Sequence, residues 1–169
     1  MYKTLLLASV IIIYSCNQDQ QQSTTLTDSQ RSAITDSIKA VIKNINNAVE
    51  ELNADLLITY FSKSDKLRFV DWDASVMYPY DSIHAAWGRL YSGMTKLVVK
   101  GGNPFINVLT PDYATAVNLS EATGTLKDSS TIGGPVAWTM LFTRESGQWK
   151  ILNCQQSIKW REPSNQKIK

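Results

Sequence analysis

Histidine and cysteine are scarce in this sequence. Its 169 residues include one histidine, His84, and two cysteines, Cys16 and Cys154. Zinc sites are built mainly from clusters of these residue types, so the composition predicts no metal site. Neither a glycine-rich phosphate loop nor a nucleophile motif occurs, and we therefore expect no cofactor. The formal net charge is only +2, which favours neither nucleic acid nor an acidic partner.

The sequence also lacks an apolar run of the roughly twenty residues that span a bilayer. Its longest such run, Leu5–Tyr14, has about ten residues and follows Lys3. With the small residue Ser15 directly before Cys16, this segment resembles a bacterial lipoprotein leader. It predicts a signal peptide over 1–15, lipidation of Cys16 and an anchor in the bacterial cell envelope. The alternatives are an ordinary cleaved signal with a chance cysteine and a retained transmembrane helix.

The rest of the chain is predicted to hold one domain with a segment on either side. Residues 16–26 are polar and glutamine-rich, which is typical of a flexible tether. The domain covers 27–160, a size that suits a single core, and a basic tail follows over 161–169. If Cys16 is lipidated, Cys154 has no partner for an intramolecular disulfide, and we expect it to be a small buried residue.

Helices are predicted for the first half of the domain. Thr27 and Gln30 form a capping-box pattern, and apolar residues then recur at three- and four-residue spacing, which predicts a long helix that stops at Asn53. Shorter elements are expected next: a helix over Ala54–Phe61, a strand over Leu67–Trp72, a loop with Pro79, and a helix from Tyr80 or Asp81 to about Gly93.

Strands are predicted for the second half. The runs are separated by turn signals rich in glycine, proline and aspartate. They are Thr95–Val99, Phe105–Leu109, Tyr113–Leu126, Val136–Arg144 and Trp149–Ile158. Helices followed by antiparallel strands indicate an α+β fold, a meander that curls around helices on one face.

The last hairpin carries a family resemblance. Gly147 supplies the turn, Trp149 and Ile151 alternate onto one strand face, and Ser157 follows near the strand end. With the helices before it, this pattern resembles the nuclear transport factor 2-like superfamily over roughly Thr27 to Trp160. The resemblance implies a cystatin-like cone, in which a strongly bent antiparallel sheet wraps the N-terminal helices and leaves a pocket. Ketosteroid isomerases and SnoaL-like cyclases share this fold, while other members only bind or dimerise.

The pocket implied by this resemblance would be bordered by aromatic residues with polar tips, which suit a flat, apolar ligand. The candidates are Tyr60, Trp72, Tyr80, Trp87 and Trp138, each of which core packing explains as well. Gln155 stands where many members carry a histidine. An amide can form hydrogen bonds but cannot shuttle a proton, which argues against a histidine-dependent reaction there.

Three carboxylates are weak catalytic candidates. Asp71 and Asp73 bracket Trp72 near the junction where ketosteroid isomerases place an acid–base aspartate; a solvated turn is the alternative. Glu121 lies in an alternating strand, where burial would raise its pKa. The small residues Ala122 and Gly124 alternate with it, however, and if they mark the inner face then Glu121 points outward.

We therefore expect an exported, lipid-anchored domain that binds a small apolar or aromatic molecule or a protein partner. The main alternative is a SnoaL-like isomerase, dehydratase or hydrolase that uses a pocket carboxylate. A further alternative is a structural module that forms a homodimer through the open face of the sheet.

Overall fold

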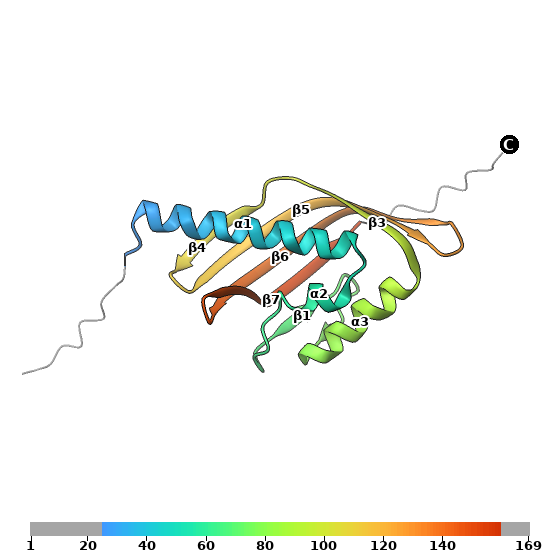
Figure 1. Cartoon of the computed structure of the whole chain (residues 1–169), viewed down its shortest axis with the longest axis horizontal. Helices are drawn as coiled ribbons and strands as arrows, with labels where there is room; N and C mark the ends of the chain where they lie inside the picture. The colour runs from blue at the N-terminus through green and yellow to red at the C-terminus, as the bar shows by residue number, and fades with distance from the viewer. Residues whose placement is uncertain (1–24, 160–169) are drawn as a thin grey trace, which may run out of the picture.

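The computed structural model describes residues 25–159, which form a long helix, two shorter helices and a curved seven-stranded sheet (Figure 1). The proposed signal peptide (1–15), Cys16, most of the tether and the basic tail lie outside the described residues. None of the helices between residues 25 and 159 has the length and apolar content that a bilayer crossing requires.

The long helix α1 (Asp28–Glu50) begins with the capping box that the sequence predicts. The Thr27 backbone N–H donates to Gln30 Oε1 (2.9 Å), and the Gln30 N–H donates to Thr27 Oγ1 (3.2 Å). The helix ends before Asn53, because Leu52 adopts a positive φ of 52°. Asn53 instead caps α2 (Ala54–Ile58) by accepting a hydrogen bond from the Leu56 N–H at 2.9 Å.

The third helix and two short strands follow. The strands β1 (Arg68–Val70) and β2 (Val76–Met77) form a small antiparallel pair, and α3 (Tyr80–Ser92) begins where the sequence predicts. β2 was expected to be loop, since two residues are too few for an alternating pattern.

Five longer strands complete the sheet: β3 (Met94–Gly101), β4 (Phe105–Thr110), β5 (Tyr113–Leu126), β6 (Thr131–Glu145) and β7 (Gln148–Ile158). The strand order is β2-β1-β7-β6-β5-β3, and β4 pairs with the first half of β5. β1 runs parallel to β7 while the other pairs are antiparallel, so the sheet is mixed.

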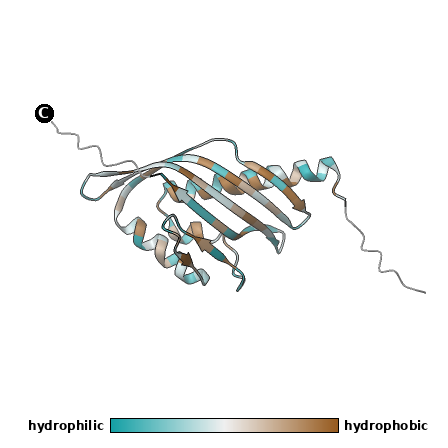
Figure 2. Ribbon diagram, turned by 180° about the vertical axis from the view of Figure 1, so that it is seen from behind, coloured by the Kyte–Doolittle hydropathy of each residue, from teal (hydrophilic) through white to brown (hydrophobic). Residues whose placement is uncertain are grey.

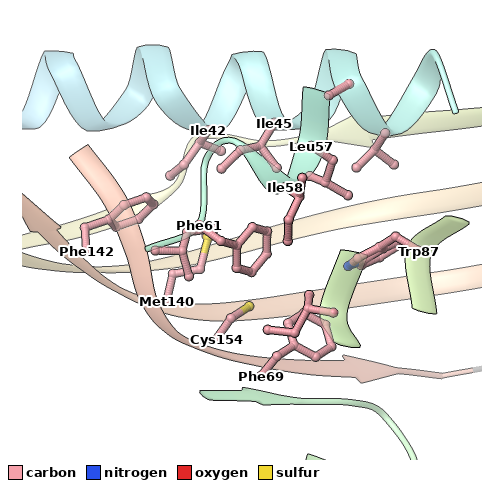
Figure 3. Packing of buried hydrophobic residues seen from close by; sticks show 14 of the residues in the cluster. Ile42, Ile45, Leu57, Ile58, Phe61, Phe69, Trp87, Met140, Phe142 and Cys154 are labelled. Carbon is pink, nitrogen blue, oxygen red and sulfur yellow. The ribbon is translucent and has the colours of Figure 1, made fainter. Parts of the chain in front are cut away.

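The core lies between the helices and the inner face of the sheet (Figure 3). Ile42 and Ile45 of α1 project toward Phe61, Met140 and Phe142, all of which are buried. Cys154 is fully buried among them, as the sequence predicts, and burial raises the pKa of its thiol. Trp149 is buried as well and borders a hollow next to Ile34 of α1.

β6 begins at Thr131, earlier than the predicted Val136, because a glycine allows it to lie close against β5. Gly133 has φ +151°, and a Cβ there would lie only 2.1 Å from the carbonyl oxygen of Ala122. A side chain at this position would therefore push the two strands apart. The extended hairpin lengthens the curved sheet beyond the end of α1 (Figure 1).

Candidate functional site

A cavity lies between the C-terminal half of α1, helix α3 and the inner face of the sheet. Its volume is about 100 Å³. The helices contribute Ile45, Asn46, Val49, Trp87 and Leu90. The sheet contributes Met94, Leu97, Val99, Asn118, Ser120, Ala122, Gly124, Ile132, Gly133, Val136, Trp138, Gln156 and Ile158. A mainly apolar hollow with a few polar groups is typical of a small-molecule site.

Small residues on β5 make room for this cavity. Ser120, Ala122 and Gly124 alternate along the strand and face inward. The sequence pattern had suggested that Ala122 and Gly124 mark the inner face, and the cavity lining confirms this. Glu121, between them, does not line the cavity, because successive side chains of a strand point to opposite faces.

Neutral polar side chains form a row across the floor of the cavity. Asn118 of β5 pairs in register with Trp138 of β6, which in turn pairs with Gln156 of β7. Asn118 and Gln156 are only 6% and 7% exposed. Within the described chain, Asn118 Oδ1, Gln156 Oε1 and the indole Nε1 of Trp87 find no hydrogen-bond partner. Each such buried atom costs about 1–3 kcal/mol unless a ligand or water satisfies it.

No ionisable side chain lines the cavity: residues 25–159 contribute no Asp, Glu, His, Lys, Arg, Tyr or Cys to its wall. Nor do three or more His, Cys, Asp or Glu side chains in this part of the chain gather as a metal site would require. The groups that the cavity offers are hydrogen-bonding amides, an indole N–H and a serine hydroxyl. They can bind and orient a molecule, but they cannot transfer a proton near neutral pH.

Two of the five predicted aromatic residues border the cavity. Trp87 and Trp138 lie 5.8 Å apart between ring centroids, and each meets the ring of Phe69 edge-on at 6.1 Å. Tyr60 and Tyr80 were predicted to line the pocket, but they do not border it. Tyr60 lies two residues beyond the end of α2 and packs against the core, and the Tyr80 ring lies 5.5 Å from the Lys63 ammonium.

Gln155 was predicted to line the pocket, and this is wrong: its side chain is exposed and Gln156 lines the cavity instead. The register between β6 and β7 shifts, so that Leu141 pairs with Asn153 while the next residue, Phe142, pairs with Ile151. Leu152 is thereby an extra residue, a β-bulge. Because side chains alternate between the two faces of the sheet, one extra residue moves every later side chain on the strand to the opposite face.

The three carboxylate candidates lie in different surroundings. Glu121 is on the outer face, and Asp73 is exposed in the β1–β2 turn, where its Oδ1 accepts a hydrogen bond from the Ser75 N–H at 2.9 Å. Bonds from Ser75 lower the pKa of Asp73. Asp71 lines a second hollow of about 140 Å³ next to the cavity, and burial raises its pKa, partly opposed by a hydrogen bond from the Trp72 N–H (2.8 Å).

The second hollow shares a wall with the cavity. Trp87, Leu90, Gln156 and Ile158 border both spaces. Trp72, a predicted pocket residue, borders only the second hollow. His84 borders neither space, and its Nε2 lies 2.7 Å from Asp55 Oδ1, where the pair links α2 to α3.

Sequence reasoning missed Asn118 and Gln156, the two buried amides of the cavity floor. Amide side chains carry no signature of their own, since most asparagines and glutamines are exposed. Asn118 had one usable signal: it lies in the same alternating set as Ala114, Ala116 and Ala122. Gln156 had only an indirect signal, because the bulge at Leu152 placed it on the inner face.

Solved structures share this architecture. A hexachlorocyclohexane dehydrochlorinase from Novosphingobium barchaimii matches with a TM-score of 0.71 at 13% identity, covering 83% of this chain and 96% of that one. A proposed scytalone dehydratase from Novosphingobium aromaticivorans gives 0.72 at 9% identity, with coverages of 85% and 94%. A nuclear transport factor 2-like protein from Salmonella enterica gives 0.70 at 16% identity, with coverages of 80% and 98%. These likenesses show the fold, the nuclear transport factor 2-like cone.

Sequence comparison points to a family within this fold. No curated protein matches the chain. The family model of the SnoaL-like domain, however, matches residues 38–160, which include the C-terminal half of α1, the two shorter helices, the sheet and every residue that lines the cavity. The chain therefore belongs to the SnoaL-like domain family.

Proposed function

We propose that this protein is an exported, lipid-anchored binding protein that holds a small, mainly apolar molecule in the cone. The observation that carries the proposal is the cavity lining, which is apolar except for neutral hydrogen-bonding groups. Asn118 Oδ1 and Gln156 Oε1 would accept hydrogen bonds from the polar edge of the ligand, and Trp87 Nε1 would donate one. Binding would thus satisfy three buried polar atoms that the described chain leaves without a partner.

Support for the anchor comes from the leader. Lys3, the apolar run Leu5–Tyr14, Ser15 and Cys16 occur in the order that lipoprotein processing requires. A diacylated cysteine carries two acyl chains, and two such hydrophobic signals give stable membrane attachment. The glutamine-rich residues 17–25 would then separate the cone from the membrane surface.

Acid–base catalysis is the rival function, as expected for the dehydratases and isomerases that share the family. It needs an ionisable group that reaches the ligand. Of the three candidates, Asp73 and Glu121 line neither space, and Asp71 lines the second hollow. A neutral ligand held wholly within the cavity therefore meets no group that could move a proton.

Ligand binding is tested best with a pair of neighbouring glutamines. Gln156→Leu removes a buried polar atom from the cavity, while Gln155→Leu makes the same chemical change on the outer face. A panel of steroid-like and aromatic compounds is screened by thermal shift and by the fluorescence of Trp87 and Trp138. A ligand at a hundred times its dissociation constant should stabilise the wild type by about 2.7 kcal/mol.

We expect Gln156→Leu to weaken binding of the hit by about tenfold, as the loss of one buried hydrogen bond does, and Gln155→Leu to leave it unchanged. Gln156→Leu should also raise the stability of the free protein, since it removes an unsatisfied buried group. The proposal fails if no compound shifts the melting temperature, or if both variants bind a hit as well as the wild type does.

A homodimer through the sheet is a second proposed role, favoured by apolar side chains on the outer face. Phe105, Tyr113 and Leu119 are exposed there, Phe105 by 69%. This face of the sheet is turned toward the viewer in Figure 2. A second copy of the chain would cover these side chains. Sedimentation of the wild type and of Phe105→Glu tests the pairing: a monomer at every concentration in both would rule it out.

A further inference from the structure

The second hollow has a chemistry that the cavity lacks. Asp71 is its one ionisable lining residue within the described chain, and it lies beside Trp72, Met77 and Trp87. Among residues 25–159, no lysine or arginine borders the space to neutralise the carboxylate. One carboxylate oxygen accepts a bond from the Trp72 N–H (2.8 Å), which leaves the group with capacity for further partners. The hollow is therefore anionic and walled by indole rings.

Aromatic rings around a carboxylate recognise organic cations. An ammonium group over an indole face is attracted by the ring quadrupole, and the attraction is stronger where water is excluded. The carboxylate adds charge attraction, which is stronger in a partly buried site than in water. Neutral ligands gain from neither effect, and anions are repelled.

The pairing of the strands places the lining residues of this hollow next to those of the cavity. The row Asn118, Trp138 and Gln156 crosses β5, β6 and β7, and β1 lies next to β7. Phe69 and Val70 of β1 pair in parallel with Cys154 and Gln155. Asp71 follows this ladder on the same inner side as Gln156. Asp71 also lies near Cys154, where burial and then the charge of Asp71 raise the pKa of the thiol.

The wall between the two spaces carries unpartnered polar atoms. Trp87 and Gln156 border both spaces, and Trp87 Nε1 and Gln156 Oε1 are two of the buried atoms without a hydrogen bond in the described chain. Neighbouring strands lie about 4.8 Å apart, and two spacings separate β1, which Asp71 follows, from Trp138 on β6. A ligand that touches both residues must therefore span roughly 10 Å, which calls for an aromatic ring that carries an ammonium group. Figure 3 shows Trp87 next to Phe69, and their ring centroids lie 6.1 Å apart.

We propose that the cavity and the second hollow form one site for an amphipathic organic cation, with the apolar body among Trp87, Trp138 and Gln156 and the ammonium group at the Asp71 carboxylate. This inference rests on the proposed function, since it names the class of ligand that the cone binds. It also assigns Asp71 to ligand recognition.

Two isosteric probes test the assignment. Phenyltrimethylammonium and tert-butylbenzene have nearly the same shape and differ in one charge. Affinities are measured by tryptophan fluorescence and calorimetry on the wild type, on Asp71→Asn and on Asp73→Asn. The last variant is the matched control, because it removes the same charge from an exposed residue of the same turn that borders neither space. Thermal melts of all three proteins confirm folding.

We expect the cation to bind the wild type at least tenfold more tightly than its neutral isostere, which corresponds to about 1.4 kcal/mol. Asp71→Asn should remove most of this preference and leave the affinity for tert-butylbenzene within about twofold, while Asp73→Asn should change neither affinity by more than about twofold. Equal affinities for the two probes, or a preference that survives Asp71→Asn, would overturn the assignment and leave the binding function standing. If neither probe binds and the panel of steroid-like and aromatic compounds described above fails as well, both proposals are overturned.

Discussion

Filling the cavity provides a sharp test of whether it is open space in the folded protein. The chosen change is Ala122→Leu, because Ala122 lies on the inner face of β5 and lines the cavity. Leucine adds three carbon atoms at this position, and the cavity volume of about 100 Å³ can take them. The matched control is Ala116→Leu, on the same face of the same strand, where Ala116 is 1% exposed, belongs to the packed core and does not line the cavity.

The two substitutions should change stability in opposite directions. Three buried carbons contribute about 0.8 kcal/mol each, or about 2.4 kcal/mol together. Fixing the leucine side chain costs about 0.5–1 kcal/mol. Ala122→Leu should therefore raise the free energy of unfolding by about 1.5 kcal/mol, which is a rise in Tm of about 3–6 °C for a domain of this size. Ala116→Leu should lower the free energy of unfolding by about 1–3 kcal/mol, because it overpacks a filled region.

Calorimetry of the free variants and thermal shift with any hit from the ligand screen measure both effects. Ala122→Leu should also abolish the response to the ligand, since the leucine takes the space that the ligand needs. The reasoning is refuted if the two variants are destabilised alike, or if the ligand still stabilises Ala122→Leu as it does the wild type.

Three further outcomes are expected. Trp149→Ala should destabilise the domain by about 3–5 kcal/mol in denaturant titrations, because it empties a buried position beside α1; a midpoint near that of the wild type would contradict this. Burial raises the pKa of Asp71 above 3.8, so the folded state holds this proton more firmly than the unfolded chain and loses stability as the carboxyl ionises. Asp71→Asn should therefore raise Tm at neutral pH and make no difference well below pH 3.8. A lower Tm of the variant at neutral pH would show that the ionised Asp71 stabilises the fold, against this prediction. Cys16→Ser should abolish lipid labelling and detergent partitioning, and unchanged labelling would refute the anchor.

Local signals in the sequence predicted most of the fold. The capping box at Thr27 and the apolar spacing that follows it predicted α1, and the alternating residues of β5 predicted that strand from Tyr113 to Leu126. Both patterns are long enough to average out single exceptions. β2 was missed because a two-residue strand has no period, and the parallel pairing of β1 with β7 depends on contacts that no local pattern contains.

Less of the candidate site could be predicted. Trp87 lies at core spacing in α3 and Trp138 in an alternating strand, so both were found. Gln155 was chosen in place of Gln156 because it stands where many members of the superfamily carry a histidine, but in this chain the bulge at Leu152 turns Gln155 outward. Two consecutive apolar residues, Ile151 and Leu152, interrupt the alternation at that point and are the one local sign of the bulge. The buried amide of Asn118 was passed over because it looks like any surface residue.

The parallel pairing of β1 with β7 has a consequence for how the chain folds during synthesis. Phe69 can take its place in the sheet only when Cys154, near the far end of the domain, is available to pair with it. Such distant contacts slow folding, because a long loop must close before they form. The β1 edge of the sheet thus stays unpaired until β7, the last strand, has been made. For the exported protein that we propose, slow folding would keep the chain unfolded, and an unfolded chain can pass through a narrow translocation channel.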